Sequence, residues 1–201
     1  MADAPPAADL QKTKARLMDV IRAKSLHTEG GPFKLASGAM SDYYIDMKPT
    51  IFSPEGLNLI ADLIFEHLRG DKGVDSIGGL ELGAVPIVAA VSMRSFRDRG
   101  IDGFVVRKET KDHGTAKKID GNFRPNTNVV LIEDVTTKGG SVMQAVKAVR
   151  AQGATVKKVI TIVDRLEGAT AALNAEGIEL VPLCTITELR RRAKPPCNPS
   201  P

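Results

Sequence analysis

Apolar and polar positions follow two alternating periods along this chain, and their order predicts an α/β domain. From residue 75 onward, short apolar runs typical of buried strands alternate with segments whose apolar residues recur at helical spacing. The predicted strands cover residues 75–80, 104–107, 129–134, 158–164 and 178–184. The predicted helices between them cover residues 86–97, 141–152 and 168–175. This alternation predicts an open parallel sheet with right-handed crossovers, flanked by helices.

The first fifty residues fall outside this alternation and predict a small cap over the strand ends. We expect an amphipathic helix over residues 9–25 and short strands over residues 32–48. A further helix is expected from Ser53, as its N-cap, to about Arg69. The predicted domains are a disordered tail (1–8), a cap (9–50), an α/β core (51–186) and a basic, Pro-rich C-terminal tail (187–201).

The segment from Val129 to Ser141 carries the strongest chemical signal. A buried strand ends at Glu133 and Asp134, and a turn rich in hydroxyl and glycine residues leads into the next helix. In open α/β sheets, ligands bind beyond the carboxyl ends of the strands. A glycine-rich turn before a helix presents backbone N–H groups to a phosphate, and paired carboxylates suit the vicinal hydroxyls of a ribose. The segment therefore predicts a ribose-phosphate site. It matches neither a Walker loop nor a dinucleotide fingerprint.

Residues 108–127 form a long polar stretch without a core pattern. Its beginning is basic, because residues 107–118 hold five basic residues against two acidic ones. Loops of this length in a compact domain are usually functional. Beside a phosphate site, this charge favours a lid that closes over a polyanion, and a solvated surface loop is the alternative.

Composition narrows the class of protein. A chain of 201 residues with 42% hydrophobic residues fits one domain with a real core, and no apolar run approaches the ~18 residues of a membrane span. The N-terminus has no signal-peptide pattern, and two cysteines make no disulfide framework, so we expect a cytoplasmic protein. The net charge of +4 equals that of four basic residues within 190–194, so nucleic acid is not an expected partner.

Three segments resemble orotate phosphoribosyltransferases of the type I phosphoribosyltransferase fold. Residues 129–141 resemble the phosphoribosyl-pyrophosphate (PRPP) signature, residues 107–114 the mobile catalytic loop, and residues 33–46 the N-terminal segment with its aromatic pair. The resemblance covers roughly residues 25–186 and implies transfer of the 5-phosphoribosyl group from PRPP to orotate. It also implies Mg²⁺ as cofactor and a homodimer that shares the loop of residues 107–121 across its interface.

The resemblance further implies roles for single residues. It assigns catalytic roles to Lys111, His113 and Asp134, and no protein ligand to the metal. The implied PRPP-binding residues are Arg107, Lys108, Lys111, His113, Glu133, Asp134, Val135, Thr136, Thr137, Lys138, Gly139, Gly140 and Ser141. The implied orotate-binding residues are Tyr44, Ile45, Thr137 and Arg165, of which Arg165 would pair with the orotate carboxylate.

Two departures and two alternatives accompany this interpretation. Ala36 and Gly83 stand where many bacterial relatives carry PRPP-contacting lysines. The alternatives are a phosphoribosyltransferase for a purine or uracil, and a regulator with the same fold that binds nucleic acid. Arg165 and the Lys/His loop favour orotate over a purine or uracil. The basic tail is the only specific support for the regulator, and the intact lid residues argue against a loss of catalysis.

Overall fold

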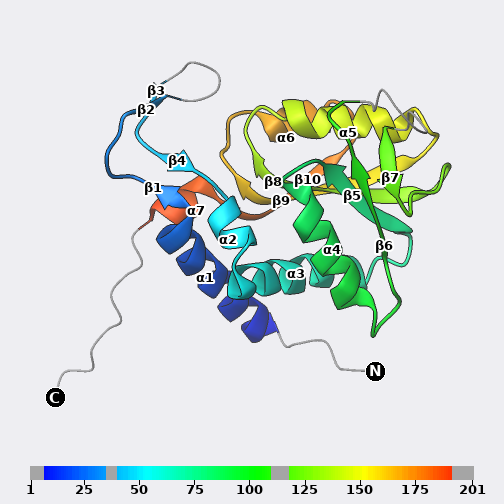
Figure 1. Cartoon of the computed structure of the whole chain (residues 1–201), viewed down its shortest axis with the longest axis horizontal. Helices are drawn as coiled ribbons and strands as arrows, with labels where there is room; N and C mark the ends of the chain where they lie inside the picture. Colours follow the sequence, from blue (N-terminus) through cyan, green and yellow to red (C-terminus); the bar gives the residue numbers. More distant parts are fainter. Residues whose placement is uncertain (1–6, 35–39, 110–117, 192–201) are drawn as a thin grey trace.

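A six-stranded sheet organises the chain, in the order β10-β9-β8-β5-β6-β7 (Figure 1). The computed structural model describes residues 7–34, 40–109 and 118–191. Five strands are parallel: β5 (Ser76–Leu80), β6 (Asp102–Val106), β8 (Asn128–Thr136), β9 (Thr155–Asp164) and β10 (Glu179–Thr185). The predicted parallel α/β sheet is thereby confirmed for these five strands.

The sixth strand, β7 (Ile119–Gly121), pairs antiparallel with β6 at the edge of the sheet. It lies within residues 108–127, so the prediction of an irregular stretch was wrong at 119–121. Three residues are too few to display the alternation that marks a strand. Residues 119–121 form a strand because their backbone pairs with β6, and their own sequence shows no strand pattern.

Helices cover both faces of the sheet. The helices are α1 (Ala7–Lys24), α3 (Pro54–Arg69), α4 (Ala84–Ser95), α5 (Gly140–Arg150) and α6 (Ala169–Asn174). Figure 1 shows α5 and α6 on one side and α1, α3 and α4 on the other. The alternating side chains of β8 serve both layers. Val130 and Ile132 pack with α3 and α4, and Val129 and Leu131 pack with α5 and α6.

The predicted start of α3 is confirmed in detail. The Ser53 hydroxyl accepts a hydrogen bond of 3.1 Å from the backbone N–H of Gly56, and Pro54 is the first helical residue. The helix ends at Arg69, as the pattern predicts. The apolar face of α3 is buried in the larger of the two groups of core residues. After α3 the chain returns to the sheet at β5.

The N-terminal region contains two small antiparallel pairs and a short helix. These elements are β1 (Leu26–His27), β2 (Phe33–Lys34), β3 (Met40–Ser41), β4 (Tyr44–Ile45) and α2 (Lys48–Ile51), with β1 paired to β4 and β2 to β3. Leu17 and Ile21 of α1 are fully buried in the same core group as α3. Ile45 of β4 lies in this core group as well. The expected cap of residues 9–50 stays a prediction.

The fold continues past the expected core boundary at residue 186. Residues 186–190 form α7 (Ile186–Arg190), capped by a reciprocal pair of hydrogen bonds between Thr185 and Glu188. Arg22 of α1 donates hydrogen bonds to the carbonyl oxygens of Glu188 and Leu189. Residues 187–190 of the expected tail are therefore helical, and residues 192–201 lie outside the described part. Among the described helices, none is long and apolar enough to span a membrane.

Candidate active site

A cavity of about 280 Å³ opens at the carboxyl ends of β5 and β8, next to α2. Its lining is Lys48, Ile51, Phe52, Leu80, Glu81, Leu82, Gly83, Pro86, Lys108, Glu133, Asp134, Val135 and Ser141. A small neighbouring hollow is lined by residues of the β8–α5 connection, Thr137, Gly139 and Gly140 among them. The carboxyl edge of the sheet thus gathers the predicted ribose-phosphate segment into one site.

Glu133 and Asp134 provide two different carboxyl groups at the end of β8. Glu133 is 7% exposed, and its Oε2 atom has no hydrogen-bond partner among the described residues. Burial, and after it the negative charge of Asp134, raises the pKa of Glu133 to about 8. The Asp134 carboxylate accepts a hydrogen bond of 2.8 Å from the N–H of Val135. At neutral pH the pair therefore offers a protonated donor beside an acceptor, which matches two adjacent hydroxyl groups.

The β8–α5 connection has two features that suit a phosphate group. Gly139 precedes α5 with a φ of 85°, a conformation that favours glycine. The N–H groups of the first turn of α5 have no partners within the helix, and they carry its positive dipole end. The hydroxyl of Thr136 is already engaged, since it donates to Asp164 Oδ1 at 3.1 Å. Thr136 therefore supports the connection, and its hydroxyl faces β9.

Gly83 lies against the carboxylate pair. A Cβ atom at Gly83 would lie 2.6 Å from Asp134 Oδ2, which is closer than real Cβ contacts. The missing side chain thus lets the turn after β5 approach Asp134. Ala36, the other departure, lies outside the described residues.

The start of the basic loop is tied to the same turn. The backbone N–H of Lys108 donates a 2.9 Å hydrogen bond to Glu81 Oε1, and Lys108 lines the cavity. Arg107 instead forms an ion pair of 3.1 Å with Asp120 on β7. Two of the predicted loop residues, Lys111 and His113, lie outside the described part of the chain.

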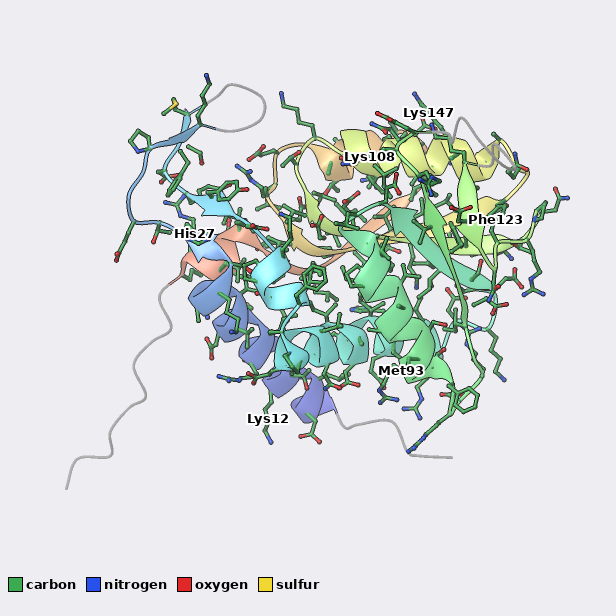
Figure 2. All side chains as sticks on the ribbon, viewed as in Figure 1. Lys12, His27, Met93, Lys108, Phe123 and Lys147 are labelled. Atoms are coloured by element: carbon green, nitrogen blue, oxygen red, sulfur yellow. The ribbon has the colours of Figure 1, made fainter. Side chains whose placement is uncertain are left out.

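The predicted orotate-binding residues are not gathered in this cavity. In the described part of the chain, its lining includes none of Tyr44, Ile45, Thr137 and Arg165. Ile45 is buried in the core. The ring of Tyr44 is 41% exposed and stacks on His27, with 6.1 Å between ring centroids. Figure 2 shows His27 at the β1–β4 end of the molecule, away from Phe123 near β7.

Three residues of this region were not predicted from the sequence: Tyr43, Lys48 and Glu81. Arg165 contacts Tyr43, whose hydroxyl accepts a 3.2 Å hydrogen bond from Arg165 Nε. Lys48 and Glu81 line the cavity without having been predicted. A place for Glu81 in the site could have been predicted, because Glu81 directly follows a buried strand. Lys48 offered no comparable signal, because α2 is too short to show a period.

Comparisons with known proteins show the family of this chain. No family model matches the chain. An orotate phosphoribosyltransferase of Rhodopseudomonas palustris (strain BisB18) is 46% identical over 171 residues, which cover 83% of this chain and 90% of that protein. The chain belongs to the orotate phosphoribosyltransferase family. The Methanocaldococcus jannaschii member is 47% identical over 160 residues, covering 80% of this chain and 88% of that protein.

Solved structures of this family share the fold. Mycobacterium tuberculosis H37Rv orotate phosphoribosyltransferase in complex with Fe(III) dicitrate matches with a TM-score of 0.77 at 35% identity, over 89% of this chain and 99% of that chain. The same protein in complex with PRPP matches with a TM-score of 0.72 at 32% identity, over 88% and 98% of the two chains. The predicted type I phosphoribosyltransferase fold is thereby confirmed.

Proposed function

We propose that this chain catalyses the reaction for which its family is named. PRPP and orotate give orotidine 5′-monophosphate and pyrophosphate, the transfer of a pentosyl group in pyrimidine biosynthesis. The observation that carries the proposal is the cavity at the end of β8. It sets a carboxyl pair beside a glycine-rich helix N-terminus, the two features that a 5-phosphoribosyl group requires.

The ribose and its 5′-phosphate fit the β8–α5 segment. Asp134 accepts a hydrogen bond from one ribose hydroxyl, and protonated Glu133 donates to the other. The backbone from Val135 to Ser141 receives the 5′-phosphate, with Thr137, Lys138, Gly139 and Gly140 between them. Support comes from the hollow that this connection lines and from the positive end of α5.

The chemical step is a displacement at the anomeric carbon of the ribose. The N1 atom of orotate forms a bond to this carbon as the bond to the pyrophosphate oxygen breaks, without a covalent enzyme intermediate. The proton on N1 is lost in this step, and the leaving pyrophosphate takes it up. Asp134 holds the ribose in line for this attack. Lys111 and His113, together with Arg107 and Lys108, offset the negative charge that develops on pyrophosphate.

Orotate selectivity is assigned to Arg165. A guanidinium group pairs with a planar carboxylate through two parallel hydrogen bonds, and uracil has no such carboxylate. Arg165 already lies 2.8 Å from the carboxylate of Glu167, the same kind of group that orotate would present. Tyr44, Ile45 and Thr137 are proposed to flank the pyrimidine ring.

A magnesium ion fits the donor atoms of the cavity. Mg²⁺ prefers oxygen ligands and keeps few protein contacts, and Glu81, Glu133 and Asp134 bring carboxyl oxygens to the lining. Within the described ranges, no three His, Cys, Asp or Glu side chains gather as a metal-binding group. An ion carried mainly by PRPP, with Asp134 and Glu133 nearby, agrees with this arrangement. When bound, it neutralises charge on the leaving pyrophosphate.

The proposal includes a homodimer that shares the loop of residues 107–121. Mixing two inactive variants, Lys111→Ala and Asp134→Asn, tests it. If the loop acts in the partner's site, each mixed dimer regains one intact site, and activity returns to roughly a quarter of the wild-type value. Absence of recovery in a mixture that demonstrably exchanges subunits would contradict sharing.

A cytoplasmic location belongs to the same proposal and rests on the cysteine pattern.

Pyrophosphate release with a panel of bases tests the substrate. The protein receives PRPP and Mg²⁺ with orotate, uracil, adenine or hypoxanthine in parallel. The proposal predicts release with orotate alone. Release with another base would leave the PRPP site standing and overturn the role of Arg165.

A further inference from the structure

Lys48 is a cation of the cavity to which neither the sequence pattern nor the comparisons assign a role. It is the first residue of α2, and its side chain lines the cavity together with the turn at Gly83 and the carboxyl pair of β8. The side chain is 63% exposed. It can therefore move within the cavity without losing buried contacts.

The backbone of Lys48 is held firmly in place. Asp46, two residues before the start of α2, accepts hydrogen bonds from the backbone N–H of Lys48 at 3.0 Å and from its Nζ at 2.8 Å. Asp46 in turn donates its N–H to the carbonyl oxygen of Ser25 at 3.0 Å. The hydroxyl groups of Ser25 and Thr50 share a buried hydrogen bond of 2.7 Å below α2. The backbone of Lys48 is thus fixed, while its side chain with the ammonium group is exposed.

The charged groups that line the cavity indicate that the ammonium group of Lys48 binds an anion. The described lining carries three carboxyl groups, on Glu81, Glu133 and Asp134, and two ammonium groups, on Lys48 and Lys108. A diphosphate ester brings several further negative charges, which the carboxylates of Glu81 and Asp134 repel. Gly83 supplies no cation, and a side chain there would meet the Asp134 carboxylate. Lys48 faces the same space from α2.

We propose that Lys48 binds the diphosphate group of PRPP and supplies the positive charge that the turn at Gly83 does not carry. The inference rests on the proposed function, because it takes PRPP as the ligand. The diphosphate is the partner rather than the 5′-phosphate, because the hollow at the start of α5 is lined without Lys48. Asp46 holds the ammonium group at the cavity edge until the ligand arrives.

Calorimetric titration with PRPP and Mg²⁺, without orotate, tests the proposal. Lys48→Ala is expected to raise the dissociation constant of PRPP about tenfold or more, and Lys48→Arg to keep it within about threefold, since the charge remains. Lys72→Ala removes an exposed lysine outside the cavity lining and serves as the matched control. Its PRPP affinity should equal that of the wild type.

Steady-state kinetics add a second readout. The KM for PRPP should rise in Lys48→Ala and the KM for orotate should not, and the salt dependence of PRPP binding should flatten. Equal PRPP affinity in Lys48→Ala and the wild type would overturn the inference, as would an equal loss in Lys72→Ala. If the wild type binds PRPP but does not convert orotate, the proposed reaction fails, while the calorimetric comparison still decides the role of Lys48.

Discussion

The guanidinium group of Arg165 lies 4.8 Å from the centre of the Tyr43 ring, and its Nε donates a hydrogen bond of 3.2 Å to the Tyr43 hydroxyl. Arg190 of α7 lies 5.3 Å from the same ring centre and forms an ion pair of 2.6 Å with Asp42. Tyr43 thus links α7 to the end of β9. Part of the basic C-terminal sequence is used in this contact.

Tyr43 is expected to position Arg165 for orotate. Tyr43→Leu removes both the cation–π contact and the hydroxyl, so the KM for orotate should rise about tenfold while the KM for PRPP stays unchanged. Tyr43→Phe keeps the ring and should show a change below about threefold. Steady-state kinetics with each substrate varied in turn measure both. A parallel rise of both KM values in Tyr43→Leu would indicate a general loss of structure instead.

Gly83→Ala is expected to impair PRPP binding without unfolding the protein. The new Cβ would meet the Asp134 carboxylate, which is the end of a side chain and can move away. Displacing it should lower kcat/KM for PRPP about tenfold or more and leave the melting temperature nearly unchanged. Gly70→Ala, where the Cβ meets no atom within 4 Å, is the control. Full activity in Gly83→Ala would contradict the placement of Asp134 against the ribose.

The raised pKa of Glu133 predicts a pH-dependent stability. The folded protein keeps this proton up to a pKa of about 8, whereas the unfolded chain loses it near the ordinary value of 4.5. The free energy of unfolding should therefore fall as the pH rises from about 4.5 to 8, by up to ~4 kcal/mol.

Glu133→Gln should remove this decline. Denaturant unfolding between pH 5 and 9 compares the variant with the wild type and with Glu29→Gln, whose carboxyl group lies on the surface. The stability difference between Glu133→Gln and the wild type should grow with pH. A constant difference would show that Glu133 is ionised in the folded protein.

The elements that build the proposed ribose-phosphate site could be predicted because their signals are local. The apolar run before Glu133, the glycine turn and the Ser53 cap each act within a few residues, and each forms the expected kind of element. The bounds differ slightly, since β8 extends to Thr136 and α5 begins at Gly140. The capping box between Thr185 and Glu188 was equally local and readable in the sequence, although α7 was not expected.

The contacts made across the fold could not be predicted in the same way. Tyr43 and Tyr44 are neighbours in sequence but point to opposite sides, and only tertiary packing decides that Tyr43 meets Arg165, 122 residues further along the chain. Lys48 reaches the cavity because α2 packs against α1 and α3, a placement without any periodic signal. The positions of Tyr43 and Lys48 can be known only from the assembled tertiary structure.

The loss of orotate absorbance on addition of PRPP and Mg²⁺ tests the central claim most directly. The proposed function predicts rapid, orotate-dependent turnover by the wild type that collapses in Lys111→Ala, because Lys111 contacts the pyrophosphate of PRPP. Absence of turnover by a wild-type protein that binds PRPP would contradict it and favour a regulatory protein that kept the fold.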